Sequence, residues 1–249
     1  MPARTRVHRL LSPVPSSGVA DTVGRRLADA IHLGLLLPGQ QLPSETALAA
    51  QLGVSTVTLR EALASLRQQG LVETRRGRHG GSFVCGPGAA SISRLRTRLR
   101  QLSVIELRDF GDEWSAIAGA AARLAAARSS ADQITRLHDL AGRVESATSI
   151  GDRGRAHSRF FIEVALASQS ERLTRVEVRL QAETGDLLWT PSDERFDPVA
   201  ASATLRSIAD SIADEDGAVA RELAERHVQL ATRWLIGAHL ALTEAPDWP

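Results

Sequence analysis

Two short apolar stripes with helical spacing, separated by a single glycine, restrict this chain more than any other feature. The first stripe lies within residues 44–52 and consists of Leu48, Ala49 and Leu52. The second lies within residues 55–69 and consists of Leu59, Ala62, Leu63 and Leu66. Ser44 and Ser55 precede the stripes as good N-caps, and Gly53 suits the left-handed turn between them. The pattern predicts a helix-turn-helix.

An earlier helix and a later hairpin complete this unit. Residues 19–35 carry an apolar side chain at each fourth position, which predicts one amphipathic helix. Residues 71–84 read LVETRRGRHGGSFV, which is typical of two short strands around a glycine-rich turn at 75–81. Three helices followed by a β-hairpin wing are the plan of a winged helix-turn-helix.

The remainder of the chain is rich in Ala, Leu and Arg at helical spacing and lacks the alternation of strands, which predicts an all-α helical bundle. We expect helices at about 99–109, 112–127, 131–147, 153–168, 171–188, 199–213, 216–225 and 226–242. The fold class is therefore mainly α. The expected parts are a flexible tail at 1–18, the winged helix-turn-helix at 19–85, a linker at 86–98 and a helical domain at 99–243.

Charge and composition exclude several classes of function. Residues 1–98 hold 13 Arg and 5 acidic residues, whereas residues 99–249 hold 17 Arg and 24 acidic residues. A basic module on an acidic remainder favours nucleic-acid binding. The chain has no Lys, which excludes Schiff-base enzymes and P-loop lysines. Its single Cys85 excludes an internal disulfide and a multi-cysteine zinc site.

Neither a membrane helix nor a secretory signal is recognisable in the sequence. No run approaches the roughly 20 apolar residues that span a bilayer. The basic N-terminus lacks an apolar core and a small-residue cleavage site. We therefore expect a cytoplasmic protein with no membrane partner, and we expect no enzymatic activity.

The residues expected to contact DNA come from both helices of the motif and from the wing. A recognition helix presents polar and Arg side chains to base edges, and glycines in a wing tip allow close approach to the duplex. The candidates from the two helices are Ser44, Thr46, Ser55, Thr56, Thr58 and Arg60. The candidates from the wing are Arg75, Arg76, Gly77, Arg78 and His79.

Residues 19–84 resemble the GntR family of bacterial regulators through the ordered text LPGQQLPSETALAAQLGVSTVTLREALASLRQQGLVETRRGRHGGSFV. The resemblance implies a homodimer on a palindromic, double-stranded operator. It also implies that the recognition helix enters the major groove and that the wing tips enter the minor groove. Thr46 and Thr56 stand where this family often has Arg.

The helical half resembles the FadR-like subfamily, whose effector domain is called FCD, in segments such as DFGDEW (109–114) and HSRFFIEVALASQS (157–170). Many FCD domains hold a divalent metal through one Asp and three His. The matching positions here are His157 for the Asp, then Phe161, Leu205 and His227. Only the two histidines can ligate, so we expect no tightly bound metal, and the sequence identifies no other cofactor. A weak site at His157 and His227 is the alternative.

Trp114 stands where the subfamily often places an Arg that binds a carboxylate. The residues expected to line an effector pocket are Trp114, His157, Phe161, Leu205 and His227. Two interpretations remain open: an apolar or bulky effector in place of a small hydroxy acid, or a pocket that has closed into ordinary core. The expected function is a repressor whose DNA affinity responds to an unidentified small molecule. The alternative is an effector-independent DNA-binding protein whose helical domain only dimerises.

Overall fold

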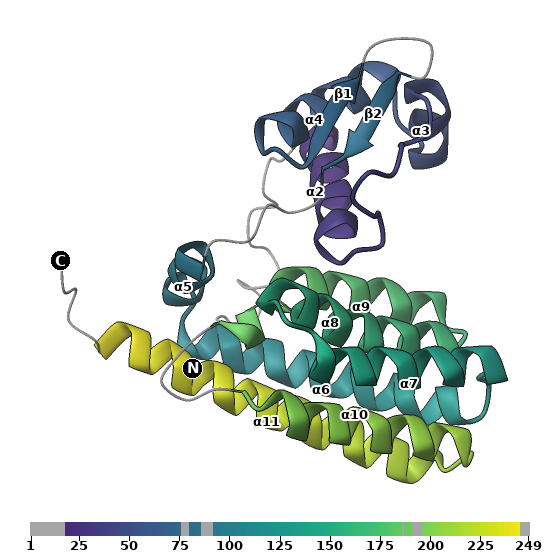
Figure 1. Cartoon of the computed structure of the whole chain (residues 1–249), viewed down its shortest axis with the longest axis vertical. Helices are drawn as coiled ribbons and strands as arrows, with labels where there is room; N and C mark the ends of the chain where they lie inside the picture. Colours follow the sequence, from purple (N-terminus) through teal and green to yellow (C-terminus); the bar gives the residue numbers. More distant parts are fainter. Residues whose placement is uncertain (1–17, 76–79, 86–91, 186, 191–195, 245–249) are drawn as a thin grey trace, which may run out of the picture. The chain divides into compact units, whose positions relative to one another are not determined.

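The computed structural model describes residues 18–75, 80–85, 92–185, 187–190 and 196–244 (Figure 1). The contacts between residues divide the chain into two compact units. One comprises Met1–Ala28 with Pro38–Cys85, and the other comprises Asp29–Leu37 with Gly86–Pro249. The first is a winged helix-turn-helix and the second is a bundle of helices, so the predicted fold class is confirmed.

The N-terminal unit contains α2 (Val19–His32) as far as Ala28, together with α3 (Glu45–Leu52), α4 (Thr56–Gln68), β1 (Val72–Arg75) and β2 (Gly81–Val84). The strands are antiparallel, with Val72 opposite Val84 and Arg75 opposite Gly81. The inner face of α4 forms the centre of this unit, because Leu59, Leu63 and Leu66 are almost fully buried.

Local hydrogen bonds define the turn between α3 and α4. The backbone N–H of Ala47 donates to Ser44 Oγ at 3.3 Å, and that of Thr58 donates to Ser55 Oγ at 3.1 Å. Gly53 ends α3 in the left-handed region, with φ 67° and ψ 31°. A residue with a Cβ would be strained in this conformation. Three residues outside the helices, Gly53 to Ser55, therefore suffice to redirect the chain.

The C-terminal unit is built from helices: α5 (Ile92–Gln101), α6 (Val104–Ala126), α7 (Ala131–Ser146), α8 (Ile150–Ala167), α9 (Glu171–Thr184), the 3₁₀ turn η1 (Leu187–Trp189), α10 (Pro198–Ala213) and α11 (Gly217–Glu244). Helix α6 packs against α8, α9, α10 and α11, while α7 packs against α8 and α10 (Figure 1). In the described part of the chain, every helix is too short or too polar to cross a bilayer.

Two of the expected helix breaks are wrong. The structure has one continuous helix α6 where two were expected around residues 110–111, and one helix α11 where two were expected around 225–226. The actual break precedes Val104, because Ser103 and Glu106 form a reciprocal capping box. Helix α5 also begins at Ile92, inside the segment expected to be a linker.

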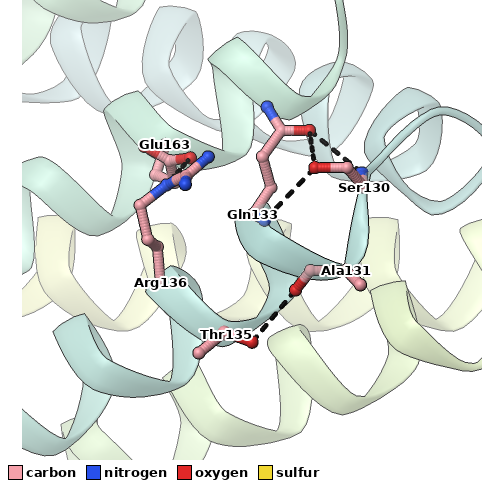
Figure 2. A network of polar contacts seen from close by, with 6 residues as sticks. All are labelled: Ser130, Ala131, Gln133, Thr135, Arg136 and Glu163. Atoms are coloured by element: carbon pink, nitrogen blue, oxygen red, sulfur yellow. Dashed lines mark hydrogen bonds and ion pairs between the residues drawn. The ribbon is translucent and has the colours of Figure 1, made fainter.

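A polar network fixes the start of α7 and ties it to α8 (Figure 2). The Gln133 backbone N–H donates to Ser130 Oγ at 3.4 Å, and the Ser130 backbone N–H donates to Gln133 Oε1 at 3.0 Å. One turn later, Arg136 Nε donates to Glu163 Oε1 of α8 at 2.9 Å. This ion pair joins α7 to α8, and α8 carries His157 and Phe161 into the core.

Helices α6 and α11 approach closely where α6 has small residues. A Cβ on Gly111 would lie 2.4 Å from Thr232 Cγ2 of α11. The β-branched Thr232 is stiff and its hydroxyl donates to the Val228 carbonyl at 2.9 Å, so it cannot easily move aside. The Gly111 position therefore sets the spacing of the two longest helices.

We expect Gly111→Ala to destabilise the protein by about 1–3 kcal/mol, because the added methyl group overpacks the α6–α11 contact. The matched control is Gly237→Ala on α11, where no atom lies within 4 Å of the new Cβ. This control should stabilise by up to about 1 kcal/mol through helix propensity. Urea denaturation of both variants tests the pair, and equal effects would show that Gly111 does not set the spacing.

Candidate nucleic-acid interface and candidate effector site

Arg60 lies on the outer surface of the helix-turn-helix. Its side chain is 64% exposed, and its Nε donates to Glu45 Oε2 of α3 at 2.6 Å. The ion pair joins the outer faces of α3 and α4, and it engages one of five N–H donors of the guanidinium. Arg60 is therefore held in place while donors remain for a phosphate or a guanine edge.

The hydroxyl groups at the two helix starts have structural roles in this conformation. Ser55 and Thr58 lie with their hydroxyl oxygens 2.8 Å apart, and Ser55 also caps α4. Ser44 caps α3. Thr46 is exposed at the first turn of α3, and Thr56 is half-buried at the start of α4. The candidates thus lie at adjacent helix N-termini, with three of the hydroxyls already engaged in local bonds.

Val57 is a candidate contact that the sequence analysis missed. It is 60% exposed on the first turn of α4, three residues before Arg60. Residues three apart lie on the same face of a helix. The only signal in the sequence is an apolar residue off the stripe of Leu59 and Leu63, and single exposed valines are common enough to be ignored.

The wing is anchored at its base by residues outside the hairpin. Gln41 pairs with Phe83 in an isolated β-bridge, and its side-chain Nε2 donates to the Gly80 carbonyl at 3.0 Å. Gly81 has φ 151°, and a Cβ there would lie 2.7 Å from Gln41 Nε2. The sequence analysis did not identify Gln41, because this contact joins residues about 40 positions apart.

Arg75 lies on the described part of the wing and is partly committed to it. Its Nε donates to Glu73 Oε1 at 2.7 Å, and its guanidinium carbon lies 4.4 Å from the centre of the Phe83 ring. The other wing candidates, Arg76, Gly77, Arg78 and His79, lie outside the described residues.

Four of the five residues expected to line an effector site meet in the core of the C-terminal unit. Trp114 of α6 packs edge-on against Phe161 of α8, with ring centres 5.1 Å apart. The rings of His157 and Phe161 each lie within 5.4 Å of His227 of α11. Leu205 of α10 is fully buried in the same hydrophobic core. All five side chains are buried.

The two histidines bond to each other. Their Nε2 atoms lie 2.8 Å apart, so one imidazole donates and the other accepts. Burial and repulsion from His227 hold the pKa of His157 well below its ordinary value, and burial lowers the pKa of His227 to about 4. Both rings are therefore uncharged at neutral pH.

These residues do not fit a zinc site. Two nitrogens bound to one tetrahedral zinc ion at about 2.0–2.1 Å would lie about 3.4 Å apart, which is wider than this pair. Phe161 and Leu205, at the remaining expected ligand positions, have no ligand atoms. Within the described residues, no group of three or more His, Cys, Asp and Glu side chains is placed to hold a metal.

A buried acid beside Trp114 was not foreseen. Glu177 of α9 is fully buried, and its Oε1 accepts from Trp114 Nε1 at 3.0 Å and from Gln181 Nε2 at 2.8 Å. Burial raises the pKa of Glu177 to about 7, against the opposing effect of these two hydrogen bonds. The sequence gives no sign of it, because α9 is otherwise a polar helix and buried Glu is rare.

Comparison with known families matches both units. Residues 19–84 match the family described as "Bacterial regulatory proteins, gntR family", and residues 115–230 match the FCD domain. The two matches fall on the winged helix-turn-helix and on the helical bundle.

Individual relatives agree with these matches. The chain is 40% identical over 250 residues to the putative HTH-type transcriptional regulator RmpR of Mycobacterium gastri. The aligned region covers 100% of this chain and 90% of that relative. It is 33% identical over 153 residues to an HTH-type regulator of Mycobacterium tuberculosis, covering 61% and 62%. The solved Escherichia coli protein McbR/YncC shares the fold at 17% identity, with TM-score 0.50 over 88% of this chain and 97% of that one.

The histidine pair predicts a loss of stability in acid. Because the folded pKa values lie below the ordinary 6.5, stability is full above pH 6.5 and falls as pH drops towards about 4. We expect the double variant His157→Gln/His227→Gln to reduce the slope of the free energy of unfolding against pH by about 2 kcal/mol per pH unit. Glu177 titrates in the opposite direction, and both proteins share it.

The measurement is chemical denaturation across this pH range. The control is His138→Gln, which removes a half-buried histidine of α7 that lies 3.6 Å from Asp210 and outside the pair. Its slope should stay steeper than that of the double variant. An unchanged slope in the double variant would show that the pair is not what makes the fold acid-sensitive.

Proposed function

The chain belongs to the GntR family of bacterial regulatory proteins and carries an FCD domain, and on that premise we propose that it is a repressor that binds a palindromic operator as a homodimer. The coarser function, a DNA-binding transcriptional regulator, follows from the family. The proposed binding to an operator is supported above all by the exposed Arg60, which lies on the outer face of α4 and is oriented by Glu45.

We propose that α4 enters the major groove, where Arg60, Thr56 and Val57 meet base edges and Thr46 meets the phosphate backbone. The wing, with Arg75, Arg76, Gly77, Arg78 and His79, approaches the adjacent minor groove, whose negative potential attracts Arg. The excess of 13 Arg over 5 acidic residues in positions 1–98 supports this docking by adding attraction to the whole duplex. Such a protein acts in the cytoplasm, where its operator is.

We propose further that a small molecule in the FCD domain controls operator affinity. Each half-site of a two-fold operator holds one α4, and the half-sites lie about 34 Å apart, one helical turn. A ligand that favours another arrangement of the dimer changes the separation of the two recognition helices, so both can no longer dock at once. The buried residues around Trp114 and Glu177 support a ligand site there, because they include polar groups that a purely structural core does not need.

Removal of the Arg60 side chain tests the proposed interface. An operator would be selected from random duplexes with the full chain, and affinities measured by fluorescence anisotropy. Arg60→Ala should weaken operator binding by about 1–3 kcal/mol, because a bidentate or phosphate contact is lost. Arg175→Ala is the matched control, since it removes an exposed Arg from α9 of the other unit. Unchanged affinity in Arg60→Ala would contradict the proposed interface.

The second prediction concerns Val57, which we propose contacts the methyl group of a thymine. Replacing one operator thymine at a time by uracil removes only that methyl group. The unaltered protein should lose about 0.8 kcal/mol at one position in each half-site. Val57→Ser should bind both versions of that position equally, whereas Val199→Ser, which alters an exposed valine on α10, should keep the difference. A difference that persists in Val57→Ser would assign the contact to another residue.

A further inference from the structure

Among the described residues, five buried side-chain atoms lack a hydrogen-bond partner, and the residues that carry them belong to the candidate effector site or adjoin it. They are His157 Nδ1, Glu177 Oε2, Gln181 Oε1, Trp189 Nε1 and Thr190 Oγ1. Leaving a buried polar atom unpaired costs about 1–3 kcal/mol, so such atoms are rare, and each needs an explanation such as an ordered water, an ion or a bound group.

These atoms belong to residues that are linked by direct contacts. Gln181 and Trp114 both donate to the other oxygen of Glu177. The Trp114 ring packs on His157 at 6.0 Å between centres, and His157 packs on Trp189 at 5.8 Å. Thr190 follows Trp189 in the chain. The unpartnered atoms therefore lie along one continuous cluster, which runs from α9 past α6 and α8 to η1.

The α9 end of this cluster offers acceptors and aromatic rings. Glu177 Oε2 and Gln181 Oε1 are both unpartnered acceptors, and they belong to residues that are one turn apart in α9. Trp114 beside them packs with Phe110 at 5.6 Å and with Phe161 at 5.1 Å. Among the described residues, the cation–π contacts involve Phe83 and Trp189, not Trp114. An ammonium group is a donor without acceptors, and both a carboxylate and aromatic faces attract it.

The opposite end of the cluster offers donors. The Trp189 indole N–H can only donate, and the Thr190 hydroxyl can do so. A ligand that satisfies this end needs an acceptor, such as a hydroxyl or a carbonyl oxygen. An anionic group is disfavoured at the α9 end, since Glu177 would repel it and the two imidazoles are uncharged. At the other end the Arg153 guanidinium carbon lies 5.6 Å from the centre of the Trp189 ring, so this end also suits an acceptor.

We propose that this cluster binds a small organic amine, whose ammonium group bonds to Glu177 and Gln181 against Trp114 and whose far end accepts hydrogen bonds from Trp189 and Thr190. This proposal rests on the proposed function in one respect only, which is that the bound amine acts as the effector. An effector site built around an Arg prefers an anionic ligand. This site should prefer a cation instead, because Trp114 stands at the Arg position and donates a hydrogen bond to Glu177.

The test compares three probes of nearly equal shape and different charge: tyramine, tyrosol and 4-hydroxyphenylacetate. Each carries a phenol hydroxyl that can accept the hydrogen bonds from Trp189 and Thr190, and the three differ only at the other end, which is an amine, an alcohol or a carboxylate. Each is added to the full-length protein, and the melting temperature is followed without DNA. The amine should raise Tm by about 3 °C at about tenfold its Kd. The alcohol should give a smaller shift and the acid none. An equal or larger shift with the alcohol or the acid, or no shift with any probe, would overturn the proposal.

A pair of variants locates the ammonium group. Glu177→Gln keeps an oxygen for the Trp114 and Gln181 bonds but removes the charge, so the amine shift should fall at least to that of the alcohol. Glu183→Gln, on an exposed position of the same helix, should leave the shift unchanged. A full amine shift in Glu177→Gln would overturn the assignment. The order of the three probes on the unaltered protein decides the charge preference even if Glu177→Gln does not fold.

Operator affinity separates this inference from the proposed function. If the amine shifts Tm and also weakens operator binding, both stand. If it shifts Tm while operator affinity stays the same, the amine site stands and its role as the effector site is overturned. If the protein binds its operator but no probe shifts Tm, the DNA-binding function stands and the amine site is overturned.

Discussion

The left-handed turn at Gly53 is the constraint on which the DNA-binding surface depends. It ends α3 and lets the Ser55 cap begin α4 two residues later, so the angle between the helices follows from backbone geometry. That angle brings Glu45 to Arg60 and leaves Arg60 exposed. The surface is thus oriented by a glycine, two serine caps and one ion pair, while the leucines of α4 secure the helix from beneath. Exposed ion pairs contribute little to stability, so the value of Glu45 lies in orienting Arg60.

The C-terminal unit solves a different problem, which is how to bury polar side chains among aromatic rings. The two histidines share one hydrogen bond and stay uncharged, and Glu177 has a pKa raised to about 7 by burial. Paired donors and acceptors satisfy part of this cluster, and the unpartnered atoms remain around the rings of Trp114, His157 and Trp189. A core with such atoms is less stable than an apolar one, which is the usual compromise at a functional site.

The parts of the fold that could be predicted from sequence are those with local causes. Ser44, Gly53 and Ser55 mark the ends of helices through bonds to residues three or four positions away, and the spacing of Leu59 and Leu63 marks a face. The errors have distant causes. A helix break was expected at residues 110–111, yet α6 continues through Gly111, and Thr232, more than a hundred positions later, occupies the space that a side chain there would need.

The same distinction holds for the two sites. The residues around His157 and His227 could be named through the family resemblance, but Glu177 and Gln181 could not, since their burial depends on where α9 packs. Val57 was not identified because its importance comes from its exposure. A hydrophobic pattern identifies only the residues on the buried face of a helix. The contact of Gln41 with the wing likewise requires the third dimension.

The central claim is that two copies of α4 read one duplex, and hydroxyl-radical footprinting of the full chain on its selected operator tests it most directly. The account predicts two protected segments related by a two-fold axis, with their centres about one helical turn apart. It also predicts protection of the flanking minor grooves by the wings. A single protected segment, or protection that is the same on unrelated sequence, would contradict the account.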